Sequence, residues 1–146
     1  MLVHNDCPYS KYTKYEYEGT TKVDGVKRDI SRTVYQRNDI DWFQRNSKGI
    51  TNLELMKNGK APYARDGSQI ELHHLLQVEP GTMVEIPGSL HDKYTKQLHG
   101  LVENGGSFRN NPILDKQYTN FRAKYWRQRY KQVSAAYIAY FFIMTT

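Results

Sequence analysis

The chain has 146 residues and a formal net charge of +6, and 38% of its residues are hydrophobic, 13% aromatic and 25% charged. This length and aromatic content indicate one folded domain rather than a disordered chain, and the positive charge favours an anionic partner: nucleic acid, an acidic protein or a membrane surface. A single cysteine, Cys7, excludes an internal disulfide framework and a cysteine-based zinc site, so histidine and oxygen ligands must hold any metal.

The first 45 residues are predicted to form a strand-rich extension. Residues 1–17 mix charged and tyrosine side chains without an apolar core, which excludes a Sec-type signal peptide. Tyrosine alternates with polar residues over 12–17, as in a strand, and residues 32–36 form a further candidate strand. Asp24-Gly25 is typical of a hairpin turn.

A short helix and a hairpin are predicted next. Residues 51–54 have the capping-box pattern, so a helix should begin there and end at Asn58-Gly59. The pair Asp66-Gly67 suits a type I′ turn and predicts a hairpin between residues 63–65 and 69–73.

The chain beyond this hairpin is expected to alternate loop and helix. Residues 77–88 contain two Pro-Gly pairs and should form a loop with at most a short strand over 82–86. A second capping-box pattern over 89–92 predicts a helix that ends near Gly100. Aromatic residues then recur at helical spacing and predict a long helix over 113–140.

The run over residues 133–144 is apolar but only 12 residues long. A helix that spans a bilayer needs about 20 apolar residues. We therefore expect a buried terminal helix and no stable membrane insertion, with a membrane-active tail as the alternative.

His73 and His74 lie at the end of the predicted hairpin strand. Because side chains alternate along a strand, the two histidines should leave it in opposite directions. One imidazole can then hold a cation while its neighbour acts as a base toward water, and hydrolysis of a phosphodiester needs both tasks. Glu71 can orient an imidazole by accepting its other N–H.

His99 is the third candidate of this group. If His91 and His99 shared one continuous helix, about 12 Å along its axis would separate them, which is too far for two ligands of one ion. We expect His99 to bind the metal and His91 to fix the neighbouring loop.

Basic residues surround Tyr125 and Trp126 on the predicted long helix. Arg122, Lys124 and Arg127 are candidate contacts to nucleic-acid phosphates, with an affinity that falls as salt rises. The alternative is that the aromatic residues belong to the core and the charges are solvated.

These motifs occur in an order and spacing that resemble a known family, the LHH-type nuclease toxins of the HNH/endonuclease VII superfamily. The resemblance covers roughly residues 32–131, and the residues that carry it are Thr51 to Pro62, Asp66-Gly67, Ile70-Glu71-Leu72-His73-His74, His91, Leu98-His99 and Tyr125-Trp126 with the basic residues that follow. The stretch from Glu71 to His74 is also similar to the corresponding stretch of the nuclease colicins.

The resemblance implies an α+β fold built on a ββα-metal (His-Me finger) core, in which a hairpin, a loop and a helix grip one ion. With the predicted elements, this gives a single domain over residues 1–146. An N-terminal strand-rich extension occupies 1–45, the nuclease core 46–132, and an apolar C-terminal helix or tail 133–146.

The resemblance also implies roles for the histidines. His73 would be the strand ligand and His99 the helix ligand of one divalent ion, which could be Mg²⁺, Mn²⁺, Zn²⁺ or Ni²⁺. His74 would be the general base that deprotonates water. His91 would fall near the middle position of the motif, which fixes the loop.

The activity implied is metal-dependent, largely sequence-nonspecific cleavage of DNA by a bacterial toxin domain. Such domains are secreted as cargo of larger toxins, act in the cytoplasm of a competitor and are neutralised in the producer by a cognate immunity protein, here expected to be acidic. A ribonuclease toxin of the same fold is one alternative. Another is a non-catalytic, basic nucleic-acid-binding module with a structural zinc site.

Overall fold

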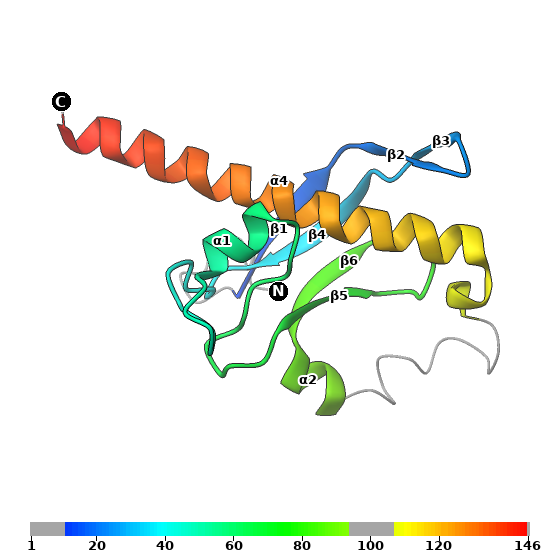
Figure 1. The fold of residues 1–146 in the computed structure, drawn as a ribbon, viewed down its shortest axis with the longest axis horizontal. Helices are drawn as coiled ribbons and strands as arrows, with labels where there is room; N and C mark the ends of the chain where they lie inside the picture. Colours follow the sequence, from blue (N-terminus) through cyan, green and yellow to red (C-terminus); the bar gives the residue numbers. More distant parts are fainter. Residues whose placement is uncertain (1–10, 94–106, 146) are drawn as a thin grey trace, which may run out of the picture.

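The structure, a computed structural model, describes residues 11–93 and 107–145. Its elements in chain order are β1 (Tyr12–Tyr17), β2 (Thr20–Val23), β3 (Val26–Asp29), β4 (Arg32–Arg37), α1 (Asn52–Lys57), β5 (Ile70–His74), β6 (Met83–Pro87), α2 (Gly88–Lys93), η2 (Phe108–Asn110) and α4 (Pro112–Thr145). Four strands form one sheet in the order β1-β4-β6-β5, and β2 and β3 form a separate ribbon. The long α4 helix crosses the sheet (Figure 1). The predicted α+β class is confirmed.

The N-terminal strands lie where the sequence predicts them. β1 and β4 are antiparallel neighbours, with Tyr12 opposite Arg37. The turn between β2 and β3 has positive φ at both central residues, 51° at Asp24 and 80° at Gly25, as a type I′ turn requires. β4 then pairs in parallel with β6, so the extension and the segment that follows residue 46 share one sheet.

The hairpin predicted around Asp66-Gly67 is wrong in its strand pairing. A single bridge joins Tyr63 to Gln69, and β5 instead pairs with β6 from Ile70–Pro87 to His74–Met83. The Ile70 amide donates to the Pro62 carbonyl, but proline has no N–H to donate in return, so this ladder cannot continue. The hairpin of the ββα unit is therefore β5–β6, and β6 is the short strand predicted inside the loop.

The predicted capping residue explains where α1 begins but not where α2 begins. The Glu54 amide donates to Thr51 Oγ1 at 3.2 Å, as predicted for α1, and a positive φ at Gly59 ends that helix. The predicted second capping box is wrong, because α2 begins at Gly88 and therefore contains Ser89. The Ser89 hydroxyl instead donates to the Asp66 carboxylate. The predicted end of this helix near residue 100 lies outside the described residues.

The core lies between α4 and the sheet. Phe121 and Tyr125 of α4 are 0% exposed, and the ring of Tyr17 from β1 meets Phe121 edge-on with centroids 5.2 Å apart. Val34 of β4 and Met83 of β6 pack in the same cluster. Burying this stripe of aromatic rings is the main apolar contribution of α4 to the fold.

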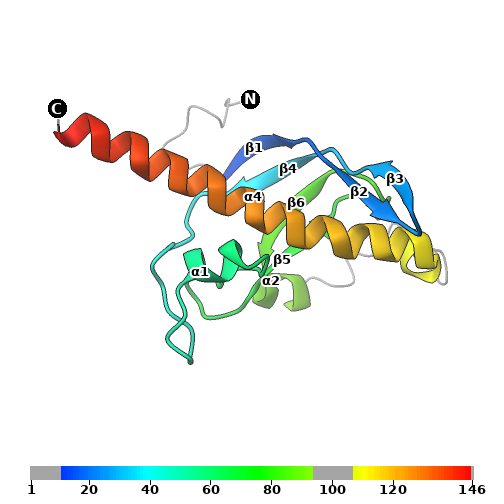
Figure 2. The ribbon, with the colours of Figure 1, turned by 45° about the horizontal axis from the view of Figure 1, so that its top comes forward.

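The prediction of a buried terminal helix is wrong. Val133 is buried, but the large apolar residues that follow it, Tyr137, Ile138, Tyr140, Phe141, Phe142, Ile143 and Met144, are 45–73% exposed. The last turns of α4 project beyond the sheet, so the sheet offers them no surface to pack against (Figure 2). Within the described residues, no helix combines the length and apolarity needed to cross a membrane.

Two phenylalanines of α4 test this account of the core. Phe121→Ala removes a fully buried ring and should lower the free energy of unfolding by about 3–5 kcal/mol. Phe141→Ala changes the same residue type in the same helix at a position 68% exposed, and should change it by at most about 0.5 kcal/mol. Urea unfolding followed by circular dichroism measures both, and equal losses would contradict the assigned core.

Candidate active site

The end of β5 forms one wall of a pocket. This cavity of about 1240 Å³ opens between β5, α2, η2 and α4. The lining side chains that can bind a metal or transfer a proton include Glu71, His73, His74, His91 and Asp92. The pocket thus gathers side chains from strand and helix around the two adjacent histidines.

One side of β5 faces α2. The rings of His73 and His91 lie 5.0 Å apart, centroid to centroid, and Nδ1 of His91 lies 3.0 Å from Oε2 of Glu71. Asp92 adds a second carboxylate, so that one ligand atom each from Glu71, His91 and Asp92 lie within 4.8 Å of one another. Glu71 therefore meets the imidazole of α2 rather than that of a strand neighbour.

His74 leaves β5 toward η2 and α4. Its ring packs against the rings of Phe108 and Tyr118, with centroids 4.6 and 4.7 Å away, and these two rings also contact each other; the residue is only 4% exposed. Its Nε2 atom lies 2.8 Å from Oε1 of Glu79. The two histidines therefore point to different elements, as alternation along a strand requires.

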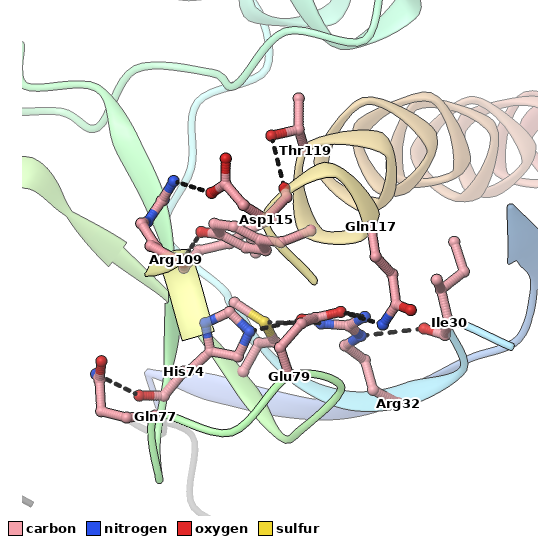
Figure 3. A network of polar contacts seen from close by, with 12 residues as sticks. Ile30, Arg32, His74, Gln77, Glu79, Arg109, Asp115, Gln117 and Thr119 are labelled. Atoms are coloured by element: carbon pink, nitrogen blue, oxygen red, sulfur yellow. Dashed lines mark hydrogen bonds and ion pairs between the residues drawn. The ribbon is translucent and has the colours of Figure 1, made fainter. Parts of the chain in front are cut away.

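Glu79, which lies between β5 and β6, is the centre of a buried polar network (Figure 3). Arg32 of β4 donates to Oε1 at 2.6 Å and to Oε2 at 2.8 Å, and Gln117 of α4 donates to Oε2 at 2.6 Å. The side chains of Arg32 and Glu79 are 1% and 0% exposed. A buried carboxylate is tolerated here because charged and polar donors surround it.

Burial and this network together set the charges of His74 and Glu79. Burial lowers the pKa of His74 and outweighs the opposing effect of the Glu79 carboxylate, so the imidazole is neutral at pH 7. Burial alone would raise the pKa of Glu79, but hydrogen bonds from His74 and Arg32 outweigh it and hold this pKa at about 2. A neutral histidine thus lies beside an ionised carboxylate.

Two guanidinium groups flank the Tyr118 ring in the pocket wall. The Cζ atoms of Arg109 and Arg122 lie 4.9 and 4.7 Å from the ring centroid, and both residues line the pocket. Asp115 pairs with Arg109 at 2.9 Å. Nε of Arg122 is buried and, among the described residues, has no hydrogen-bond partner. This wall therefore presents positive charge to an anionic ligand.

The other two predicted phosphate contacts lie elsewhere. Lys124 donates to the Thr20 carbonyl at 2.9 Å, on the side of the β2–β3 ribbon. The guanidinium of Arg127 lies beside Gly59, where an added Cβ would be 3.0 Å from its Cζ. Of the three basic residues predicted, Arg122 is the one that lines the pocket.

The donors in the pocket fit a divalent ion. Imidazole nitrogen suits zinc and nickel, carboxylate oxygen suits magnesium and manganese, and the group formed by Glu71, His91 and Asp92 offers both kinds of donor beside His73. Glu71 can serve as a ligand or as the acceptor that orients the His91 ring. His99 lies outside the described residues, so its role as ligand stays a prediction.

Four residues near the two histidines were not predicted from the sequence as site residues: Glu79, Asp92, Arg109 and Tyr118. Glu79 precedes a proline in a segment predicted as loop, and its partners Arg32 and Gln117 are 47 and 38 residues away. No local pattern can reveal contacts of that range. Asp92 carried one usable signal, its place next to a histidine, which the capping-box interpretation hid.

Comparison with known families agrees with this arrangement. Residues 51–132, more than half of the chain, match the family described as LHH, a nuclease of the HNH/ENDO VII superfamily with conserved LHH. The chain carries this triplet as Leu72-His73-His74, at the end of β5. No solved structure matches the chain.

Metal binding tests the strand ligand. His73→Ala should weaken binding of Zn²⁺ or Ni²⁺, measured by isothermal titration calorimetry, by about 10-fold or more, because it removes a nitrogen donor beside the cluster. His4→Ala, the same substitution within the first ten residues, should leave the affinity unchanged. Unaltered binding by His73→Ala would exclude this residue as a ligand.

Proposed function

This chain belongs to the LHH family of the HNH/ENDO VII nuclease superfamily, and on that basis we propose that it is a metal-dependent endonuclease that cleaves DNA with little sequence preference. Its substrate is nucleic acid, as the family implies. The observation that carries the proposal is the divergence of two adjacent histidines from β5, one toward the nitrogen and oxygen donors of α2 and the other into a buried polar network.

Different residues are proposed to bind the metal ion and to accept the proton during hydrolysis. His73 and His99 hold the ion, with Glu71 and His91 beside them. When bound, a divalent ion polarises the scissile phosphate and stabilises negative charge on the leaving oxygen. His74 accepts the proton of the attacking water, a role supported by its neutral state at pH 7.

Substrate binding is proposed to rest on the positive wall of the pocket. The guanidinium groups of Arg122 and Arg109 both lie against the Tyr118 ring in the pocket wall and can neutralise phosphates that flank the scissile bond. Lys124 and Arg127 are proposed to contribute only a longer-range attraction. Contacts to phosphates carry no sequence information, which supports cleavage with little sequence preference.

We propose that this nuclease acts as the toxin domain of a larger secreted bacterial protein, in the cytoplasm of a target cell. The resemblance to nuclease toxins motivates this setting. A producing cell then needs a cognate immunity protein, and the net charge of +6 favours an acidic one.

A plasmid cleavage assay tests the activity. Wild-type protein with Mg²⁺, Mn²⁺, Ni²⁺ or Zn²⁺ should nick or cut plasmid DNA, and EDTA should stop it. His74→Ala should lower the cleavage rate by about 100-fold or more while the metal affinity is kept, because only the base is lost. A DNA strand compared with its RNA counterpart identifies the substrate, and faster RNA cleavage would favour the ribonuclease alternative.

Two results together would contradict the proposed nuclease activity. The protein would cleave neither DNA nor RNA with any of the four metals, and EDTA would not change its melting temperature. If the His74→Ala variant instead loses its metal and unfolds, a structural zinc site is favoured.

The salt dependence of DNA binding tests Arg122. Arg122→Ala should weaken binding of a short duplex to metal-free protein and reduce the slope of log K against log salt by about 1, as expected for one lost phosphate contact. Lys27→Ala removes an exposed positive charge from β3, far along the chain from the pocket residues, and should leave the slope nearly unchanged. Equal slopes for the two variants would exclude a phosphate contact by Arg122.

A further inference from the structure

We propose that Glu79 is a positioning residue for His74 and that Arg32, from the strands that precede the matched family region, holds Glu79 in place. The inference rests on the proposed function, in which His74 is the base. It extends the active site to β4, because residue 32 lies outside the matched residues 51–132.

The donor and acceptor inventory of the network fixes the His74 tautomer. An ionised carboxylate only accepts hydrogen bonds, so the 2.8 Å contact between Nε2 of His74 and Oε1 of Glu79 requires the proton to sit on Nε2. Nδ1 then keeps its lone pair. Within the described residues nothing hydrogen-bonds to Nδ1, and His74 lines the pocket. The network therefore leaves Nδ1 as the proton acceptor.

Each oxygen of Glu79 is held from two directions. Oε1 accepts from His74 and Arg32, while Oε2 accepts from Arg32 and Gln117. Arg28 of β3 donates to Oε1 of Gln117, which turns the amide so that its NH₂ group faces the carboxylate. The carboxylate cannot rotate without breaking at least two charge-assisted hydrogen bonds.

Arg32 is itself immobilised. Its Nε donates to the Ile30 carbonyl at 3.0 Å, and its Cζ lies 3.8 Å from the centroid of the Phe121 ring. The His74 imidazole, which Arg32 reaches through Glu79, packs against the rings of Phe108 and Tyr118. Arg32 therefore fixes the Glu79 oxygen that contacts His74, and the two aromatic rings fix the orientation of the His74 ring.

A second buried ion pair supplies the matched control. Glu85 of β6 is paired with Arg129 of α4 at 2.9 Å, and these side chains are 0% and 6% exposed. The pair resembles Arg32–Glu79 in burial and in its double hydrogen bond, but neither residue lines the pocket. Loss of Glu85 should therefore mimic the structural effect of losing Glu79 without the effect on His74.

The first experiment compares Glu79→Gln with Glu85→Gln. An amide at position 79 can donate to Nε2 of His74 and so stabilise the other tautomer, with the proton on Nδ1. Glu79→Gln should lower kcat for DNA cleavage by about 10²–10⁴-fold with KM changed less than about 3-fold, since a wrong histidine tautomer has an effect of that size in serine proteases. Glu85→Gln should keep kcat within about 3-fold, and Glu79→Asp should recover part of the loss. Rates are measured at a temperature where all variants are folded.

The second experiment reads the tautomer directly and needs no activity. Long-range ¹H–¹⁵N correlation spectra of metal-free wild-type protein at pH 7.5 should show His74 protonated on Nε2, with the His74→Ala spectrum giving the assignment. Protonation on Nδ1, or cleavage by Glu79→Gln at the rate of Glu85→Gln, would overturn the inference. If wild-type protein cleaves neither DNA nor RNA, the proposed function fails while the spectrum still decides how His74 is positioned, even if a variant does not fold.

Discussion

The packing of one stripe of α4 against the sheet is the interaction on which the rest of the structure depends. This stripe recurs every fourth residue, at Gln117, Phe121, Tyr125, Arg129 and Val133, all of them buried. Its apolar members fill the core, and its polar members reach carboxylates on or beside the β5–β6 hairpin. A single helix face therefore closes the hydrophobic core and also holds the carboxylate that contacts His74.

The stripe also supplies hydrogen-bond donors to two buried carboxylates, Glu79 and Glu85. An unpaired buried charge costs several kcal/mol, and removing one partner of a buried pair typically costs about 3–5 kcal/mol. Glu85 meets Arg129 from the helix, whereas Glu79 meets Arg32 from β4 and Gln117 from the helix. The first pair ties α4 to the sheet. The second pair also contacts His74, which lines the pocket, so it connects β4 to the site as well as to the core.

Local sequence patterns predicted turns and helix caps well, but they failed where contacts between residues far apart in the chain determine the structure. The Asp24-Gly25 turn and the Thr51 cap are set by neighbours in the chain, and both were predictable. The pairing of β5 with β6 was not, because Asp66-Gly67 is an equally good turn signal and the deciding fact is that Pro62 lacks an N–H. In the site, the adjacent histidines were evident from their spacing, whereas Glu79 acquires its role only through β4 and α4. The apolar run after Val133 predicted burial, but composition does not reveal whether a surface is left to cover it.

The projecting end of α4, residues 134–145, is helical because it continues a helix that the folded domain stabilises. A peptide of the length of residues 134–145 is marginal as a free helix in water, because forming the first turn is costly. Here the buried turns up to Val133 act as the nucleus, and each further residue needs only to add one hydrogen bond to an existing helix. The ordered display of aromatic and aliphatic side chains on this rod is thus coupled to folding of the nuclease. Unfolding of the domain would remove the buried turns that nucleate this helix, and residues 134–145 would lose their helical structure.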